Sequence, residues 1–199
     1  MPHALIIHKI DSTVAIEIEK KYVIDKKRLV ELSAKLEEVG AVFDYETFEE
    51  NYLHRGGVLD ERGAVLRLRK SDLNTTLTYK EKTGFAGEFK QQIEHETIVS
   101  DVAATESIIE RLGYTLAVVY EKHRKAWKLG KVEVVLDEVP FGYYMEIEGE
   151  IADILKAEKL LKIKDLETEA RGYPRLTLKY GKLTKNGVYE ARFEKKTAA

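Results

Sequence analysis

The sequence predicts a mainly β (α+β) fold, in which eight antiparallel strands close into a barrel with a charged lumen and helices pack outside it. Three observations support this prediction. Eight segments alternate apolar and polar residues with period two, as β-strands do because successive side chains point to opposite faces. The polar faces of several segments carry almost only Glu or almost only Lys and Arg. Three helical segments each have an apolar face, which can cover the apolar side of the sheet and leave the charged side facing inward.

The predicted strands are separated by turn signals such as Gly56-Gly57 and Asp72-Leu73-Asn74. An antiparallel sheet with this number of strands can close on itself and enclose a small cavity. In chain order the strands span residues 14–24, 46–54, 64–70, 75–83, 88–98, 117–128, 131–139 and 143–149.

Three further segments have the apolar spacing of helices. Asp25 and Asp101 are candidate N-caps of the first two, and Asp153 is expected to open the third. Gly40 and Gly113 follow the last apolar positions of the first two and can end them. The expected helices span residues 25–39, 101–112 and 152–161.

The charged residues occupy alternate positions of the strands. In the first strand Glu17, Glu19 and Lys21 share one face, whereas Lys20 points the other way. A solvated sheet face would explain any single strand. Across five strands, however, the segregation of acidic from basic residues favours a charged lumen, which would attract a polyanion and a divalent cation. The same alternation places on one face of their strands Arg67, Arg69, Lys80, Lys82, Lys122, Arg124, Glu146 and Glu148.

Three Glu-x-Glu triplets aim pairs of carboxylates in one direction. Six clustered carboxylates would repel one another unless positive charge lies among them. Divalent metal ions and the Lys and Arg residues are the candidates. His95, between two inward glutamates, should point outward. The triplets are Glu17-Ile18-Glu19, Glu94-His95-Glu96 and Glu146-Ile147-Glu148.

Composition excludes several classes of protein. The charged content is 34% but the net charge is only −2, which argues against a nucleic-acid-binding surface. The chain has no Cys, so disulfides and thiolate metal sites are excluded. No apolar run approaches a membrane span, so we expect a soluble, cytoplasmic protein. Without a Pro-, Gly- or Ser-rich linker we expect one domain over residues 1–199, with a core over about 14–180 and a flexible tail over 186–199.

The first triplet, as Glu17-x-Glu19-x-Lys21, resembles the ExExK signature of the CYTH superfamily, the triphosphate tunnel metalloenzymes. That family includes class IV adenylyl cyclases, thiamine triphosphatases and inorganic triphosphatases. The resemblance implies an eight-stranded antiparallel β-barrel that forms a tunnel. It covers about residues 14–149, in order and rough spacing, through Leu66-Arg67-Leu68-Arg69, Leu77-Thr78-Tyr79-Lys80, Glu94-x-Glu96, Lys122-x-Arg124, Val132-Glu133-Val134, Asp137 and the run from Gly142 to Gly149.

The resemblance also implies roles for the charged residues. A metal, Mg²⁺ or Mn²⁺, would be held by oxygen ligands, which suit these hard ions: Glu17, Glu19, Glu146 and Glu148. The triphosphate would be bound by donors that match phosphate oxygens: Lys21, Arg67, Arg69, Lys80, Lys122 and Arg124. The catalytic set would comprise one lysine and three glutamates that serve a second metal or its waters: Lys21, Glu94, Glu96 and Glu146.

The chain departs from the family pattern at two places. Gln92 stands where many members have a basic residue, and Asn51-Tyr52-Leu53-His54 replaces a Tyr-x-Asp of the second strand. Asp137 matches a family acid near the tunnel mouth, or else forms the turn before Pro140. The basic residue that caps the tunnel in some members corresponds to one of three: Arg171, Lys179 or Lys182.

Residues and resemblance together predict metal-dependent hydrolysis of tripolyphosphate, thiamine triphosphate or a nucleoside triphosphate. The alternative is a class IV adenylyl cyclase, which makes cyclic AMP and pyrophosphate from ATP. A second alternative is a polyphosphate-binding module without turnover, although such a module would gain nothing from six lumen carboxylates. The expected partner is the small-molecule substrate, with no nucleic acid and no membrane, bound by a monomer or homodimer. Substitution of Lys20, on the outer face, should be nearly silent.

Overall fold

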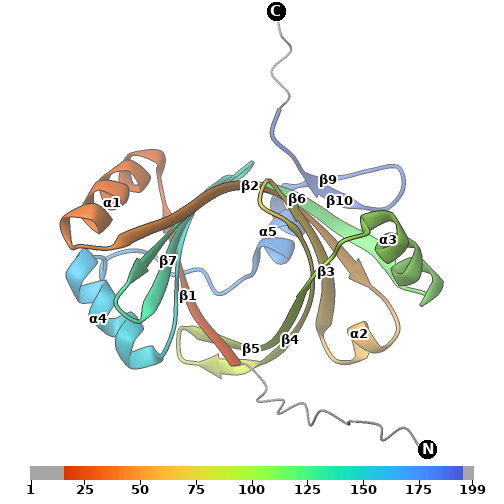
Figure 1. The fold of residues 1–199 in the computed structure, drawn as a ribbon, viewed down its shortest axis with the longest axis horizontal. Coiled ribbons are helices and arrows are strands. Elements are labelled where there is room, and N and C mark those ends of the chain that lie inside the picture. The colour runs from red at the N-terminus through yellow and green to blue at the C-terminus, as the bar shows by residue number, and fades with distance from the viewer. Residues whose placement is uncertain (1–15, 195–199) are drawn as a thin grey trace, which may run out of the picture.

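The computed structural model describes residues 16–194, in which eight antiparallel strands form a closed barrel (Figure 1). The order around the barrel is β2-β3-β4-β5-β1-β8-β7-β6, and pairing of β2 with β6 closes it. The predicted fold class is therefore confirmed. The strands are β1 (Ile16–Ile24), β2 (Val42–Arg55), β3 (Ala64–Ser71), β4 (Thr75–Ala86), β5 (Phe89–Ile98), β6 (Thr115–Leu129), β7 (Val132–Val139) and β8 (Gly142–Glu148).

The register of β1 gathers the acidic residues. On one side, Glu17 pairs with Gln92 of β5. On the other side, Glu19 pairs with Glu148 of β8, and Lys21 with Glu146. Directly paired residues point to the same face of a sheet. The first and third Glu-x-Glu triplets therefore lie side by side on the inner wall.

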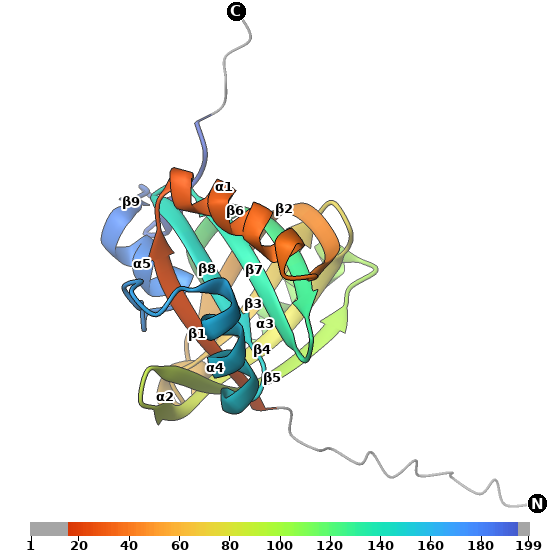
Figure 2. The same cartoon turned by 90° about the vertical axis from the view of Figure 1, so that its left-hand side faces the viewer.

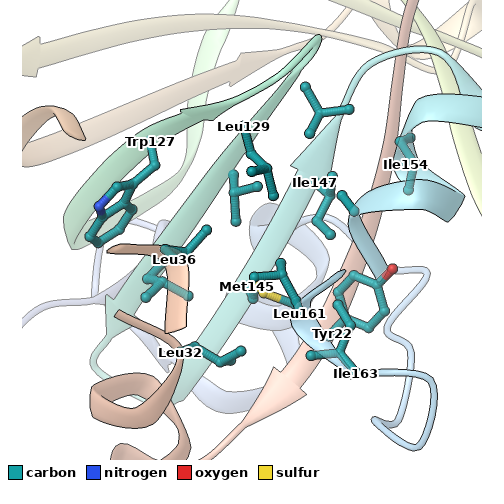
Figure 3. Close-up of a cluster of buried hydrophobic side chains, with 14 of the residues drawn as sticks. Tyr22, Leu32, Leu36, Trp127, Leu129, Met145, Ile147, Ile154, Leu161 and Ile163 are labelled. Carbon is teal, nitrogen blue, oxygen red and sulfur yellow. The ribbon is translucent and has the colours of Figure 1, made fainter. Parts of the chain in front are cut away.

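Two helices, α1 (Lys26–Glu38) and α4 (Ile151–Leu161), cover the outer face of β1, β8 and β7 (Figure 2). On the other side of the barrel lie α2 (Val58–Glu61) and α3 (Val102–Arg111). Apolar residues that alternate with the lumen residues form the core beneath α1 and α4. Figure 3 shows its buried members, among them Tyr22, Leu32, Leu36, Trp127, Leu129, Met145, Ile147, Ile154, Leu161 and Ile163.

The predicted ends of the first two helices are confirmed. The carboxylate of Asp25 accepts a hydrogen bond from the backbone N–H of Arg28 at 2.7 Å, and Asp101 caps α3 in the same way. Gly40, at φ +79°, ends α1 in the left-handed region that glycine tolerates. The expectation for Asp153 is wrong, because Gly149, at φ +151°, turns the chain directly from β8 into α4. Asp153 lies inside the first turn of α4.

The C-terminal part of the chain contains elements that the sequence pattern did not predict. Helix α5 (Tyr173–Tyr180) lies across one end of the barrel, where Tyr173 and Leu176 pack in a second apolar cluster with Tyr120 of β6. After the short strand β9 (Lys182–Leu183), β10 (Tyr189–Ala191) pairs with β6 in parallel. Part of the segment expected to be a flexible tail is therefore a strand.

The described strand ends lie within about four residues of the prediction, and the start of β2 differs most. β2 begins at residue 42 rather than 46, because the long strand β6 offers pairing partners for residues 42–45. Residues 14–15 of the first predicted strand and residues 195–199 of the predicted tail lie outside the described part of the chain. None of the helices within residues 16–194 is long and apolar enough to cross a membrane.

Candidate active site

The barrel encloses a cavity of about 660 Å³. Eleven Lys or Arg and seven Glu side chains line it. This excess of positive charge suits an anion, and the seven carboxylates suit a cation beside it. The structure brings into this one cavity all twelve predicted site residues: Glu17, Glu19, Lys21, Arg67, Arg69, Lys80, Glu94, Glu96, Lys122, Arg124, Glu146 and Glu148.

The acidic wall of the cavity is formed by β1, β5 and β8. The carboxylate of Glu17 accepts hydrogen bonds from Gln92 and from the Nζ of Lys80, the latter at 3.0 Å. Glu19 is paired with Lys90 at 2.9 Å. Burial acts against ionisation of Glu17, but Lys80 and the hydrogen bonds together lower its pKa. Gln92 thus takes the place of a basic residue by donating a hydrogen bond to Glu17.

Two glutamates of this wall have a raised pKa. Partial desolvation, together with the charges of Glu17, Glu133 and Glu19, raises the pKa of Glu148 to about 8. Burial and a hydrogen bond with Glu17 raise the pKa of Glu94 to about 7, although its ion pair with Lys80 acts in the opposite direction. Glu148 has three glutamates near it and no ion pair with a residue between 16 and 194, so positive charge is in deficit around Glu148.

The side chains of the acidic wall decide whether it could hold a metal ion. Within residues 16–194 no three His, Cys, Asp or Glu side chains are already gathered around one metal-sized point. The donors are nevertheless all carboxylate oxygens, and the glutamates around Glu148 raise its pKa, so a divalent cation there would offset their negative charge. The residues present therefore fit a hard divalent ion, with Glu17, Glu19 and Glu148 nearest to the deficit.

The basic wall of the cavity begins with the two arginines of β3. Arg69 donates to Glu96 at 3.1 Å, and Arg67 lies 3.4 Å from the same carboxylate. Thr78, whose hydroxyl donates to Glu96 at 2.7 Å, also accepts from Arg67. Burial opposes ionisation of Glu96, but Thr78 and the arginines lower its pKa. One carboxylate thus occupies the position where two guanidinium groups converge.

A second basic group lies on β6. Arg124 binds both oxygens of Asp137, at 2.7 and 2.6 Å, and also Glu146 at 2.7 Å. Lys122, which is 2% exposed, lies 3.4 Å from Glu49. Burial, followed by the charge of Arg124, lowers the pKa of Lys122 despite these acids. Burial would raise the pKa of Glu49, but Lys122 and nearby arginines lower it to about 2.

The turn reading of Asp137 is wrong. The residue lies inside β7 and is fully buried. Besides Arg124, it accepts a hydrogen bond from the hydroxyl of Tyr173 at 2.7 Å. Its carboxylate therefore fixes the arginine and joins α5 to the barrel wall. The turn before Pro140 does not need it, because strand β7 continues to Val139.

Lys21 lies between the two walls, close to α5. Its Nζ is 3.1 Å from Glu146 and donates to the backbone carbonyl of Arg171 at 3.1 Å. The same ammonium lies 3.9 Å from the centre of the Tyr173 ring. Of the three basic residues considered as caps, Arg171 lines the cavity, whereas Lys179 and Lys182 do not.

Several lining residues were not in the predicted site. Lys90 could have been found from the alternation of β5, and Glu133 from that of β7. Tyr173 and Arg175 carry no such signal, because their position depends on how α5 folds back over the barrel end. His95 is exposed on the outer face, as predicted.

Lys20 has a packing role that the sequence pattern did not indicate. It lies on the outer face of β1, as predicted, but it is 7% exposed. Its Nζ lies 2.6 Å from Glu158 of α4, a carboxylate that also accepts from the hydroxyl of Tyr22 at 2.7 Å. Glu88 lies 2.9 Å away on the more exposed side. Lys20 therefore supports the packing of α4, and its substitution cannot be silent for stability.

Comparison with known proteins identifies the family to which the chain is similar. The model of the CYTH domain matches residues 15–179. The structure of the PH1012 protein of Pyrococcus horikoshii OT3 is similar, with a TM-score of 0.70 and 25% identity over 80% of this chain and 98% of that one. A comparison with curated protein sequences finds no match.

Two more distant structures share the fold. A candidate adenylate cyclase from Vibrio parahaemolyticus has a TM-score of 0.63 and 19% identity, covering 81% of this chain and 97% of that one. A candidate adenylyl cyclase from Hippeastrum, described as having a dominant triphosphatase activity, has a TM-score of 0.59 and 18% identity, covering 78% of this chain and 91% of that one. Matched over most of its length by the family model, with its charged tunnel in the expected place, the chain belongs to the CYTH domain family.

Proposed function

We propose that this protein is a metal-dependent triphosphatase that hydrolyses a triphosphate compound inside the barrel. The observation that carries the proposal is the division of one cavity into an acidic wall and a basic wall. Inward-facing Lys and Arg outnumber Glu by eleven to seven, so the cavity favours a polyanion. A protein that only bound anions would not need the carboxylates that crowd around Glu148.

Several acids and bases of the cavity pair with one another. Glu96 occupies the guanidinium groups of Arg67 and Arg69. Glu17 likewise occupies Lys80 at 3.0 Å. Phosphate oxygens can take the place of these carboxylates as acceptors, and Arg suits them because its planar fork donates two hydrogen bonds. Binding of the triphosphate would thus release the carboxylates of Glu17 and Glu96 from their bases.

The released carboxylates would then be available for a divalent cation. Glu17, Glu19 and Glu148 would hold it, with Glu146 and Glu94 completing the acidic side. A bound Mg²⁺ or Mn²⁺ supplies charge neutralisation and lowers the pKa of a coordinated water. Asp137 keeps Arg124 oriented, and Lys21 is positioned by the carbonyl of Arg171.

Hydrolysis adds the oxygen of a water to a phosphorus and breaks the anhydride bond to the bridging oxygen. Charge spreads over the phosphoryl oxygens during this step, so preorganised Arg and Lys donors stabilise it. The description of the Hippeastrum relative supports this class of reaction. That of the Vibrio relative makes cyclisation of ATP the reaction to test beside it.

The test is incubation of the protein with tripolyphosphate, thiamine triphosphate and ATP, each with Mg²⁺, Mn²⁺ or excess chelator. Products are separated by chromatography. We expect orthophosphate from at least one substrate, dependent on metal. Formation of cyclic AMP and pyrophosphate from ATP would show that the protein is a cyclase instead of a triphosphatase. Binding of tripolyphosphate without any product would show that it is a binding module without turnover. Undiminished turnover in chelator would contradict the metal assignment.

A further inference from the structure

One end of the tunnel carries positive charge beyond the set that faces the acidic wall. Lys82 and Lys90, from the hairpin of β4 and β5, line the same cavity as Arg171 and Arg175, from the start of α5 and the segment before it. Lys82 and Arg175 are exposed there, whereas the bases deeper in the tunnel, such as Arg67, are buried. This end of the cavity is thus a basic mouth, formed by these four residues.

Two cations of the basic mouth differ from those deeper inside. Each of the six predicted triphosphate-binding bases has a Glu or Asp oxygen within 4.0 Å, for example Lys21 with Glu146 and Lys80 with Glu17. By contrast, Lys82 and Arg175 form no such ion pair with any residue between 16 and 194. Slight desolvation, followed by the positive charges of Arg175 and Lys90, lowers the pKa of Lys82, because these cations lie near one another. A group of cations without acidic partners attracts an external anion.

The basic mouth continues the line of the proposed triphosphate site. Lys80 and Lys82 point to the same face of β4, two residues apart, which corresponds to about 7 Å along the strand. An anionic chain that contacts Lys80 can therefore extend outward to Lys82. Arg175, in the first turn of α5, lines the same cavity, and its charge acts on Lys82.

Phe85 lines the cavity beside Lys82, and the Nζ of Lys82 lies 3.7 Å from the centre of its ring. The ring therefore positions the ammonium group by a cation–π contact. A phosphate can bind to this ammonium directly, whereas a neutral nucleoside gains nothing from its charge.

We propose that the basic mouth binds phosphates beyond the third, so that the preferred substrate class is a linear inorganic polyphosphate of more than three phosphates. This inference rests on the proposed function, since the first three phosphates occupy the inner bases. The mouth also disfavours thiamine triphosphate with its cationic ring at this end, because Lys82 and Arg175 would repel it.

The test compares the dissociation constants of tripolyphosphate and tetrapolyphosphate by calorimetric titration at low ionic strength in chelator. The variants are Lys82→Ser/Arg175→Ser and the charge-matched control Lys164→Ser/Arg111→Ser, whose side chains are exposed and do not line the cavity. For the native protein we expect tetrapolyphosphate to bind about tenfold more tightly than tripolyphosphate. That ratio should fall close to one in the mouth variant and stay unchanged in the control.

The outcomes separate the two proposals. If tripolyphosphate does not bind to the native protein, the proposed function fails and this inference fails with it. If tripolyphosphate binds and is hydrolysed, but the ratio is near one or is the same in both variants, the mouth site alone is overturned. Tighter binding of ATP than of tetrapolyphosphate would also overturn it, because a nucleoside would then occupy this end of the tunnel.

Discussion

Lys20 and Lys21 are neighbours in β1, both are buried, and they serve opposite faces of the barrel wall. Lys21 points into the lumen, where Glu146 and the carbonyl of Arg171 hold it beside the cavity. Lys20 points outward and is covered by α4, where it binds Glu158. The charged residues of the inner face are thus available to a ligand, whereas the buried charges of the outer face contribute to packing.

The two ion pairs differ in what surrounds them. Lys21 and Glu146 adjoin an open cavity, so an incoming anion can exchange partners with them. Lys20 and Glu158 are buried beneath α4 beside the hydroxyl of Tyr22, away from the cavity, and Glu88 reaches Lys20 from the more exposed side. Removal of one partner from an enclosed pair leaves an uncompensated charge and is strongly destabilising. Substitution of Lys21, inside the barrel, should therefore impair ligand binding, whereas substitution of Lys20, on the outer face, should lower the stability of the fold.

The largest effect is expected inside the barrel. Glu19→Gln should lower turnover of the native substrate by at least about 100-fold, because it removes a carboxylate from the acidic wall. The fold should be kept, since the change relieves repulsion near Glu148. Steady-state kinetics with Mn²⁺ and thermal melting in chelator check both parts. Glu37→Gln, on the exposed face of α1, is the matched control. Activity close to that of the control would remove Glu19 from the site.

The outer face should give the largest effect on stability. Lys20→Met leaves Glu158 buried without its cation, and we expect the free energy of unfolding to fall by about 3 kcal/mol. This lies at the low end for a broken buried pair, because Tyr22 still donates to the carboxylate. Urea denaturation measures the change. Lys164→Met, on an exposed loop, should be near neutral. Equal midpoints for the two variants would mean that Lys20 carries no packing role.

The metal-free barrel should lose stability as pH rises. The pKa of Glu148 is about 8 in the folded protein against an ordinary value of 4.5, so between these values the folded state keeps a proton that the unfolded state has lost. Stability from this group is therefore complete below about pH 4.5 and declines as pH rises through about 8. Glu148 is only partly withdrawn from water, so the decline should be modest. Melting temperatures in chelator should fall less with pH in Glu148→Gln than in the native protein or in Glu37→Gln.

The smallest effect should come from a change that keeps the charge. Arg67→Lys should weaken binding of tripolyphosphate about tenfold, because an ammonium cannot replace the two-pronged guanidinium donor. Arg62→Lys, which alters an exposed side chain outside the cavity, is the control. Unchanged binding in Arg67→Lys would show that this position provides only charge.

Much of the inner face could be predicted because it depends on local geometry. Alternation along a strand decides which side chains share a face, and the charge of Glu17, Arg67 or Lys80 identifies that face as the lumen. The capping role of Asp25 is equally local. The same local signal failed at Asp153, where the backbone of Gly149 decides the start of the helix.

The remaining features depend on contacts between distant parts of the chain. Lys20 meets Glu158 across 138 positions, so its burial could not be seen from the pattern of β1. The contact of Asp137 with Tyr173 could not be predicted, because Tyr173 lies in α5, a helix that the sequence pattern did not indicate. The basic mouth contains Arg175 for the same reason.

The most direct test of the account is a titration of tripolyphosphate into Lys21→Met and Lys20→Met, each held below its melting temperature. Lys21→Met should bind tripolyphosphate at least about tenfold more weakly than the native protein, because a charged donor is lost from the cavity. Lys20→Met, although less stable, should bind with the native affinity. Equal weakening in both variants would contradict the assignment of the two faces of β1, and with it the claim that the lumen binds the triphosphate.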